Sequence, residues 1–404
     1  MKRNGAAVSA ALATLHARGE RRARRCVEAY ASDALTAPVV GGRRLANFCS
    51  NDYLGLAGDP RLAEAMCKAA ARYGSGAGAA HFVTGHSAEH HALEEELAEF
   101  TGREAALLFS TGYMANAGVI TALAGRGEVV LQDRLNHASL IDGARQCGAR
   151  LLRYRHNDMQ EAGRIAAEQE TSLALIATDG VFSMDGDVAP VAELSAIARR
   201  HGAWLLVDDA HGLGVLGKHG GGVLGQAQLD AQAVPLLVGT LGKAFGSFGA
   251  FVAGDREVIE LVMQRARSYL FTTALPPAVA AATRAALAIV RAEPWRRERL
   301  AMLITRFRAG AQARGLPLAD SMTAIQPLQV PGAATCVAAS EALLRRGYWV
   351  SAIRHPTVPA GTERLRVTLS AAHGETEVDG LLDALQASLA EAPAATTPRA
   401  EGAP

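Results

Sequence analysis

The stretch Trp204-Leu-Leu-Val-Asp208-Asp209-Ala-His211-Gly212 begins with four apolar residues and then changes at once to two acids and a histidine. Short, continuously apolar runs are typical of strands that are buried on both faces, as in parallel sheets. Polar residues that follow such a strand lie at the carboxyl edge of the sheet, where α/β proteins bind ligands. The stretch therefore predicts an α/β fold with a site at that edge.

Similar apolar runs recur between residues 100 and 255. We predict strands at Ala105–Phe109, Val129–Gln132, Arg150–Arg153, Leu173–Thr178, Trp204–Val207, Leu236–Val238 and Phe248–Val252. Helical patterns separate several of them, at Ala115–Ala124, Ala138–Cys147, Asp158–Glu168 and Val191–Arg200. This alternation predicts a mostly parallel central sheet flanked by helices.

The pattern changes on both sides of this region. A glycine-rich loop at Gly74–Gly85 precedes a helix predicted over Ala88–Phe100 with Ser87 as its N-cap. Long helices follow residue 255, and then shorter strands at Ile325–Val330, Tyr348–Ile353 and Arg364–Leu369. We predict an N-terminal helical segment (1–45), a large α/β domain (46–290), a small C-terminal α+β domain (291–391) and a disordered tail (392–404).

Composition excludes several classes of protein. The 404 residues include 41 Lys and Arg against 40 Asp and Glu, a net charge of +1, which argues against a nucleic-acid partner. No apolar run reaches the roughly 18 residues of a membrane-spanning helix, so no membrane association is expected. The five cysteines are odd in number and scattered, without metal-like pairing, which predicts a reducing, cytoplasmic compartment and no metal site.

The N-terminus imitates a secretory signal, because Lys2 and Arg3 precede the apolar stretch Gly5–Leu15. Its larger residues recur at helical spacing, however, and the stretch leads directly into a run of arginines. An amphipathic docking helix fits this pattern better, with a mitochondrial transit peptide as the alternative.

A single lysine stands in the segment Val238-Gly-Thr-Leu-Gly-Lys243-Ala-Phe-Gly246, directly after a predicted strand and between glycines. Burial lowers the pKa of a lysine, and the neutral amine can form a Schiff base. Taken alone, the segment fits a surface-loop lysine beside a turn better than a reactive one. It is not a Walker motif, because Ala244 follows the lysine.

Other strand ends carry polar groups too. Asp208, at the end of a strand, would need a cationic partner. Alternatively, Asp208, Asp209 and His211 could form a helix cap or a surface turn. A metal site is a further alternative, although no other ligand pattern accompanies these three residues. The turn Ser110–Asn116 offers helix N-terminal amides suited to a phosphate. Together with Asn136–Ser139 and Thr178–Asp187, these groups converge on one edge of one sheet.

Read together, these motifs identify a family. SNDYLGL (Ser50–Leu56), STGYMAN (Ser110–Asn116), DGVFSMDGD (ending at Asp187), VDDAHG (Val207–Gly212) and GTLGKAFG (ending at Gly246) resemble the α-oxoamine synthases, which are fold-type I pyridoxal-phosphate enzymes. The resemblance covers residues 10 to 390. The segments Ala352–Arg366 and Ser370–His373 are most similar to the family members of biotin synthesis.

The resemblance implies pyridoxal phosphate as the cofactor and a role for each strand-end group. Lys243 would bind the cofactor as a Schiff base and act as the general base, while Asp208 would pair with the pyridine nitrogen. His137 would stack on the ring, His211 would bond the ring hydroxyl oxygen and Ser183 would help to place it. The phosphate would be held by Gly112, Tyr113 and Thr240, and by Thr272 from the neighbouring subunit.

The resemblance also implies an activity, in which L-alanine condenses with a pimeloyl thioester and carbon dioxide is lost. Arg366 would bind the alanine carboxylate, and Arg25, His137 and Thr357 match substrate-contacting positions. Arg25 lies in an arginine run, so the matching residue can be any of Arg21 to Arg25. The acyl carrier stays open between coenzyme A and a carrier protein, and a homodimer with a shared active site is expected.

Three alternatives remain from the sequence. A sister synthase would use glycine with acetyl-CoA or succinyl-CoA. A pyridoxal-phosphate lyase or aminotransferase would need no thioester. A non-catalytic phosphate or cofactor binder would use Lys243 only as a counter-ion.

Overall fold

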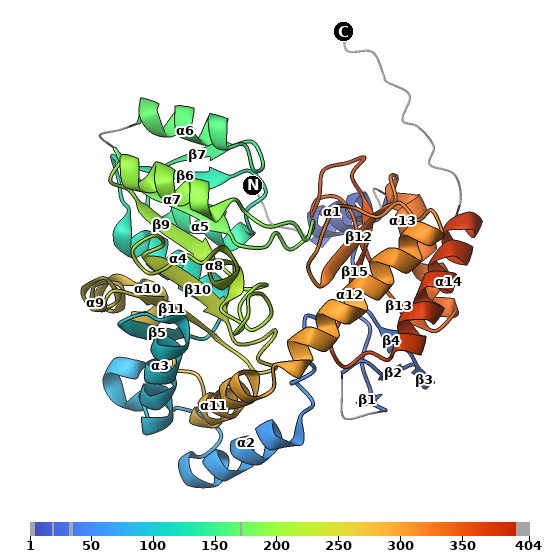
Figure 1. Ribbon diagram of the computed structural model, residues 1–404, viewed down its shortest axis with the longest axis horizontal. Helices are drawn as coiled ribbons and strands as arrows, with labels where there is room; N and C mark the ends of the chain where they lie inside the picture. The colour runs from blue at the N-terminus through green and yellow to red at the C-terminus, as the bar shows by residue number, and fades with distance from the viewer. Residues whose placement is uncertain (1–4, 18–19, 32–34, 170–171, 393–404) are drawn as a thin grey trace. The chain divides into compact units, whose positions relative to one another are not determined.

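The computed structural model describes residues 5–17, 20–31, 35–169 and 172–392 (Figure 1). The chain divides into two compact units. We call Asp52–Ser183 together with Asp187–Glu298 the sheet unit. The terminal unit comprises the described residues up to Asn51, Met184–Gly186 and those from Arg299 onward. Each is described by itself.

The sheet unit is built on a seven-stranded sheet of order β5-β11-β10-β9-β8-β6-β7. Six strands run parallel, and β11 runs antiparallel to both of its neighbours, β5 and β10. The mostly parallel sheet predicted from the apolar runs is therefore confirmed. The strands are β5 (Ala105–Phe109), β6 (Val129–Asp133), β7 (Arg150–Tyr154), β8 (Leu173–Asp179), β9 (Trp204–Asp208), β10 (Leu236–Thr240) and β11 (Ala250–Gly254).

Helices cover both faces of this sheet. One core joins alternate strand residues such as Leu107, Leu175 and Leu206 to α4, α5 and α9. Because strand side chains alternate, Leu108, Ile176 and their equivalents face the other side, where α3 packs on β5 and β11 and α7 packs on β8 and β9. The unit's helices are α2 (Pro60–Tyr73), the π-helical turn η1 (His81–Gly85), α3 (Ala88–Thr101), α4 (Gly112–Leu123), α5 (Ala138–Gln146), α6 (Met159–Glu168), α7 (Val191–Arg200), α8 (Gly222–Ala227), α9 (Arg256–Arg265), α10 (Arg267–Leu270) and α11 (Pro277–Ala292).

Capping residues mark the starts of three of these helices, and α4 begins at Gly112, three residues before the predicted start at Ala115. Asp59 caps α2 by accepting a hydrogen bond from the Arg61 amide, and Pro60 fills its first position. Thr111 caps α4 through a 3.2 Å hydrogen bond from the Met114 amide. Ser87 is the N-cap of α3, as predicted.

The terminal unit joins both ends of the chain. Strand β4 (Ala46–Asn47) pairs in parallel with β13 (Tyr348–Trp349), so residues far apart in the sequence share one unit. The domain limits predicted at residues 45 and 291 place β4 in the large domain and β13 in the small one. Sequence patterns could not predict their pairing, because pairing between distant strands leaves no local signal. Helix α12 (Trp295–Ala313) carries the chain from one unit into the other. The other elements are α1 (Gly5–Ala17), β1 (Ala29–Tyr30), β2 (Pro38–Val40), β3 (Arg43–Arg44), β12 (Ile325–Gln329), α13 (Ala333–Arg345), β14 (Ser351–Ile353), β15 (Arg364–Thr368) and α14 (Glu375–Glu391).

Both ends of the chain bear on the sequence predictions. Helix α1 forms as the spacing predicts, and none of its residues is buried. The tail predicted to be disordered lies outside the described residues beyond Ala392. Among the described helices, none is both long and apolar enough to cross a bilayer.

Candidate active site

Lys243 lies in the turn that joins β10 to β11. Its Nζ atom is 2.8 Å from Nε2 of His211, and Nδ1 of His211 is 2.5 Å from the hydroxyl of the buried Tyr53. A charged lysine can only donate, so His211 would accept at Nε2 and donate from Nδ1 to the Tyr53 oxygen. Three side chains thus form one hydrogen-bonded row at the carboxyl edge of the sheet.

Asp208 ends the neighbouring strand β9 and is held by two neutral donors. Its Oδ1 accepts from the Ala210 amide at 3.0 Å, and its Oδ2 accepts from Nδ2 of Asn116 at 2.5 Å. Only 6% of Asp208 is exposed. A buried carboxylate whose two oxygens are oriented by hydrogen bonds is positioned to pair with a cationic partner such as a protonated ring nitrogen.

His137 follows β6 and belongs to the same hydrogen-bond network. Asn116 also donates to Oγ of Ser139 at 2.9 Å, and that oxygen lies 2.7 Å from Nδ1 of His137. Because Nδ1 also accepts from the Ser139 amide at 3.3 Å, the ring hydrogen is placed on Nε2. Burial lowers the pKa of His137, while the negative charge of Asp208 opposes that shift.

Two buried carboxylates, Asp179 and Asp209, accept backbone hydrogen bonds at this edge of the sheet. Asp179 accepts from the His137 amide at 2.6 Å, and burial raises its pKa well above the usual range, with the charge of Asp208 adding to the rise. Asp209 accepts from the Val223 amide at 2.8 Å, and burial raises its pKa in the same direction. Burial therefore favours the neutral form of both Asp179 and Asp209.

The predicted phosphate turn is the N-terminus of α4. The amides of Gly112 and Tyr113 begin this helix, where backbone N–H groups and the helix dipole favour an anion. A Cβ atom at Gly112 would meet nothing within 4 Å, so the backbone there is open to a ligand. The Tyr113 hydroxyl donates to Asp142 at 2.5 Å, which turns the side chain toward α5.

The other predicted cofactor residues lie in nearby turns of the sheet unit. The Thr240 hydroxyl donates to the Gly249 carbonyl at 3.2 Å, at the end of β10. Ser183 lies in the turn that follows β8. Thr272 follows α10, and its hydroxyl is 3.5 Å from the Thr273 carbonyl.

Of the predicted substrate residues, His137 lies in the sheet unit, whereas Arg25, Thr357 and Arg366 belong to the terminal unit. Arg366 is buried on β15, the central strand of the sheet β12-β15-β14, where its guanidinium donates to Thr368 at 2.9 Å and to Asn51 at 3.2 Å. Thr357 accepts a 2.6 Å hydrogen bond from Arg22. Arg25 instead pairs with Glu341 at 2.6 Å. Within the arginine run, Arg22 is therefore the residue that contacts Thr357.

Sequence reasoning missed Asn116, Tyr53 and Ser139, although all three lie inside the motifs quoted above. Asn116 had a usable signal, because it is a polar residue within the apolar helix α4 and is fully buried. Tyr53 had none, since its partner His211 comes from a distant part of the chain, whereas Ser139 contacts both the neighbouring His137 and the distant Asn116.

These residues fit a phosphorylated, cationic ring cofactor bound through a lysine. The fold and this site define the class, a pyridoxal-phosphate-dependent transferase of fold type I. The model of the aminotransferase class I and II family matches residues 43–385.

Curated relatives narrow this class further. The 8-amino-7-oxononanoate synthase of Methylococcus capsulatus is 58% identical over 93% of this chain and 97% of its own length. The one from Alkalilimnicola ehrlichii is 58% identical over 94% and 96%. The chain belongs to the aminotransferase class I and II family and, within it, to the 8-amino-7-oxononanoate synthase family.

Solved structures agree with this assignment. A serine palmitoyltransferase from S. paucimobilis with a bound PLP–myriocin aldimine matches with a TM-score of 0.89 at 32% identity, over 95% of this chain and 96% of that one. An 8-amino-7-oxononanoate synthase from Francisella tularensis matches with a TM-score of 0.76 at 29% identity, over 86% and 98%.

Proposed function

We propose that this chain condenses L-alanine with a pimeloyl thioester to give 8-amino-7-oxononanoate, carbon dioxide and a free thiol. The observation that carries the proposal is the row Lys243–His211–Tyr53 beside the buried Asp208. The choice of substrates is supported by the name of the relatives that are 58% identical.

Pyridoxal phosphate, when bound, supplies a ring that accepts the electron pair left on the alanine Cα atom. Lys243 would bind the cofactor covalently and later remove the Cα proton at Nζ. Asp208 would hold a proton on the ring nitrogen through its carboxylate, and Asn116 keeps that carboxylate oriented. His211 would direct Nζ and bond the ring hydroxyl oxygen.

Other groups would position the cofactor without moving protons. His137 would stack against the ring, with its orientation fixed by Ser139. Ser183 would contact the ring substituents. The phosphate would be held by the amides of Gly112 and Tyr113, by the Thr240 hydroxyl and by Thr272 of the partner subunit.

In the proposed reaction, each bond that forms is matched by a bond that breaks. The alanine Cα–H bond breaks and its proton moves to Lys243. Cα then bonds to the thioester carbonyl carbon as the C–S bond breaks, and the leaving thiolate takes a proton from solvent. The bond from Cα to the carboxylate breaks next, releasing carbon dioxide, and Cα takes up the proton held by Lys243. Arg366 would hold the carboxylate beforehand, and Thr357 with Arg22 or Arg25 would contact the acyl substrate.

A homodimer follows from the role given to Thr272 and from the surface next to it. Phe82 and Val83 on η1 and Phe271 after α10 are 51%, 73% and 71% exposed. Large exposed apolar side chains that gather in one region are typical of protein interfaces. A second copy of the chain would cover them, and sedimentation of a Phe271→Asp variant as a monomer would test this.

We further propose that the protein works in the reducing cytoplasm. All five of its cysteines, which lie among the described residues, are free thiols. Free cysteines scattered over both units are typical of compartments that keep thiols reduced.

The decisive experiment measures thiol release from pimeloyl-CoA by the cofactor-loaded protein with L-alanine, glycine or L-serine. We expect release with L-alanine. Preference for glycine would indicate a sister synthase. Preference for L-serine would indicate an activity like that of the serine palmitoyltransferase to which the fold is similar. Release from a pimeloyl carrier protein alone would identify the acyl carrier.

A further inference from the structure

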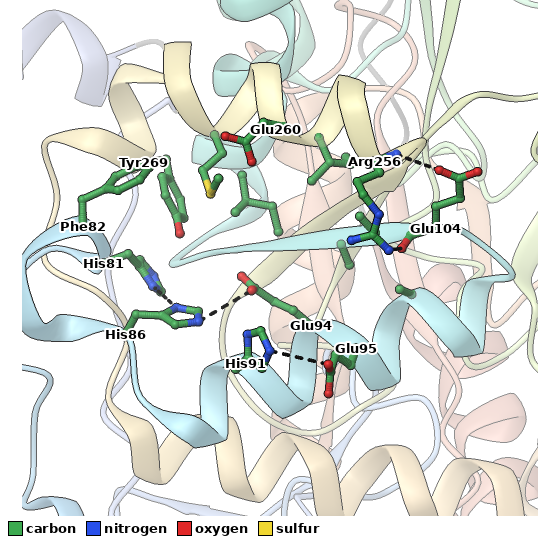
Figure 2. A pocket seen from close by; sticks show the side chains of 16 residues that line it. His81, Phe82, His86, His91, Glu94, Glu95, Glu104, Arg256, Glu260 and Tyr269 are labelled. Carbon is green, nitrogen blue, oxygen red and sulfur yellow. Dashed lines mark hydrogen bonds and ion pairs between the residues drawn. The ribbon is translucent and has the colours of Figure 1, made fainter.

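Four histidines gather at the start of α3, in a part of the sheet unit that the proposed reaction does not use. His81 and His86 come from η1 and its end, and His90 and His91 come from α3. Neighbouring ring centroids are 5.2 to 5.9 Å apart. His81, His86 and His91 line one cavity of about 450 Å³. Their side chains are shown in Figure 2.

His90 is not available as a ligand. Its Nδ1 accepts a 3.0 Å hydrogen bond from the Ser87 amide, so its hydrogen is on Nε2, which donates to the Leu275 carbonyl at 2.7 Å. Both ring nitrogens are therefore used in closing the first turn of α3.

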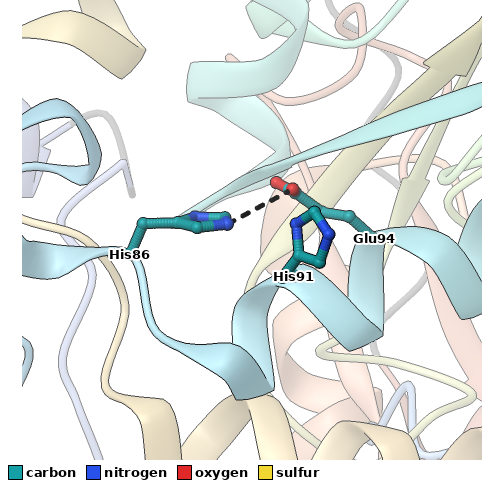
Figure 3. Close-up of side chains that lie close together, drawn as sticks. All are labelled: His86, His91 and Glu94. Carbon is teal, nitrogen blue, oxygen red and sulfur yellow. Dashed lines mark ion pairs between the residues drawn. The ribbon is translucent and has the colours of Figure 1, made fainter.

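His86, His91 and Glu94 differ from His90 because their ligand atoms converge (Figure 3). One nitrogen of each histidine and one Glu94 oxygen all lie within 4.8 Å of one another, and Nε2 of His86 is 4.0 Å from that carboxylate. His91 and Glu94 are three positions apart on α3, which places them on one helix face. Tetrahedral zinc holds N and O ligands about 3.3 Å apart, so the remaining adjustment is about 1.5 Å or less. His91 can supply it by rotation, since 69% of its side chain is exposed.

Two of the three groups are already oriented by neighbours. His81 contacts Nδ1 of His86 through its own Nδ1 at 3.0 Å, and its ring stacks on Tyr269 at 4.8 Å. Glu94 accepts from the Leu108 amide at 2.9 Å through Oε1, which turns Oε2 toward His86. Hydrogen-bonded partners of this kind orient the ligands of metal sites.

We propose that His86, His91 and Glu94 bind a divalent transition-metal ion of the zinc class, with water as the fourth ligand. Two imidazoles and one carboxylate are a zinc donor set, whereas calcium and magnesium prefer oxygen ligands. Glu95 and Glu260 line the same cavity and add negative charge. The sequence predicted no metal site, because His86 and His91 match no motif spacing. The ion would join the end of η1 to α3.

The test uses the cofactor-loaded protein, dialysed against chelator and titrated with zinc chloride by calorimetry. We expect one zinc ion per chain from this site and a rise in the unfolding temperature when zinc is present. His86→Gln and His91→Gln should each weaken that binding at least about tenfold. His219→Gln, at another exposed histidine of the same unit, should leave binding unchanged.

Cobalt(II) provides a second readout, because a tetrahedral N/O site gives visible absorption bands that should vanish in His91→Gln. His81→Phe keeps the ring on Tyr269 but removes the nitrogen that orients His86, so binding should weaken about 10- to 100-fold. Zinc that binds equally to the wild type and to both ligand variants would sit elsewhere, on cysteines or the cofactor, and would overturn the proposal. An equal loss in His219→Gln would overturn it as well.

Discussion

His156 sits between two acids, and this arrangement predicts how stability depends on pH. Its Nδ1 is 3.1 Å from Asp133 and its Nε2 is 2.7 Å from Asp187. Partial burial lowers the pKa of His156, but hydrogen bonds to the two carboxylates and their charges outweigh burial and raise the pKa to about 10. The protonated ring therefore forms one salt bridge to Asp133 at the end of β6 and another to Asp187 in the segment after β8.

The size of the effect follows from this shift. A rise from 6.5 to about 10 corresponds to about 4 to 5 kcal/mol. Because 28% of the side chain is exposed, we discount this to about 2 to 3 kcal/mol. A raised pKa stabilises the fold fully below pH 6.5, and the stabilisation is lost as pH rises toward 10.

The variant His156→Gln isolates this contribution, since glutamine does not titrate. Urea unfolding followed by circular dichroism should show the wild type about 2 to 3 kcal/mol more stable at pH 6.5, with the difference shrinking by pH 9.5. His219→Gln, at an exposed histidine, should follow the wild type at every pH. A difference between wild type and His156→Gln that stays constant with pH would refute the protonated bridge.

Three further substitutions test the site. Lys243→Ala should abolish turnover and leave the cofactor removable by dialysis, as absorbance spectra would show; unchanged turnover would exclude the covalent role. Asn116→Ala removes a donor to the buried Asp208 carboxylate, so the free energy of unfolding should fall by about 1 to 3 kcal/mol and cofactor affinity should fall with it; full affinity in a fluorescence titration would argue against positioning. Gly246→Ala would put Cβ 2.4 Å from a backbone nitrogen at a φ of +62°, costing more than about 3 kcal/mol in urea unfolding. Gly242→Ala, whose nearest neighbour would be 3.5 Å away, is the matched control, and equal losses would contradict this reasoning.

Local patterns predicted the elements well where a strand or helix is bounded by its own residues. Ala105–Phe109 and Val191–Arg200 coincide with β5 and α7. The strand predicted at Phe248–Val252 is β11, which spans Ala250–Gly254. Gly249 adopts a φ of +110°, so it belongs to the preceding turn and the strand begins after it. The antiparallel direction of β11 was not predicted, because its apolar run resembles those of the parallel strands; the available signal was the connection from β10, which is too short for a helical crossover.

The site was predictable only in part, for a physical reason. Asp208 ends a strand, and His211 and Lys243 each lie three residues beyond one, so the topology alone brings them to one edge. Asn116 reaches Asp208 only because α4 packs across the sheet, which is a tertiary property. The metal ligands His86 and His91 likewise meet through the way the chain enters α3.

The reversed strand β11 has a mechanical consequence. It pairs with β10 along one side and with β5 along the other, so Ala250 lies between Thr240 and Phe109. The turn that carries Lys243 and the turn that begins α4 therefore both follow strands that pair with β11. Neither turn can shift far without breaking backbone hydrogen bonds between these strands. In the proposed reaction, Lys243 would exchange its partners by rotation about its own side-chain bonds, without displacement of the strands on either side of its turn.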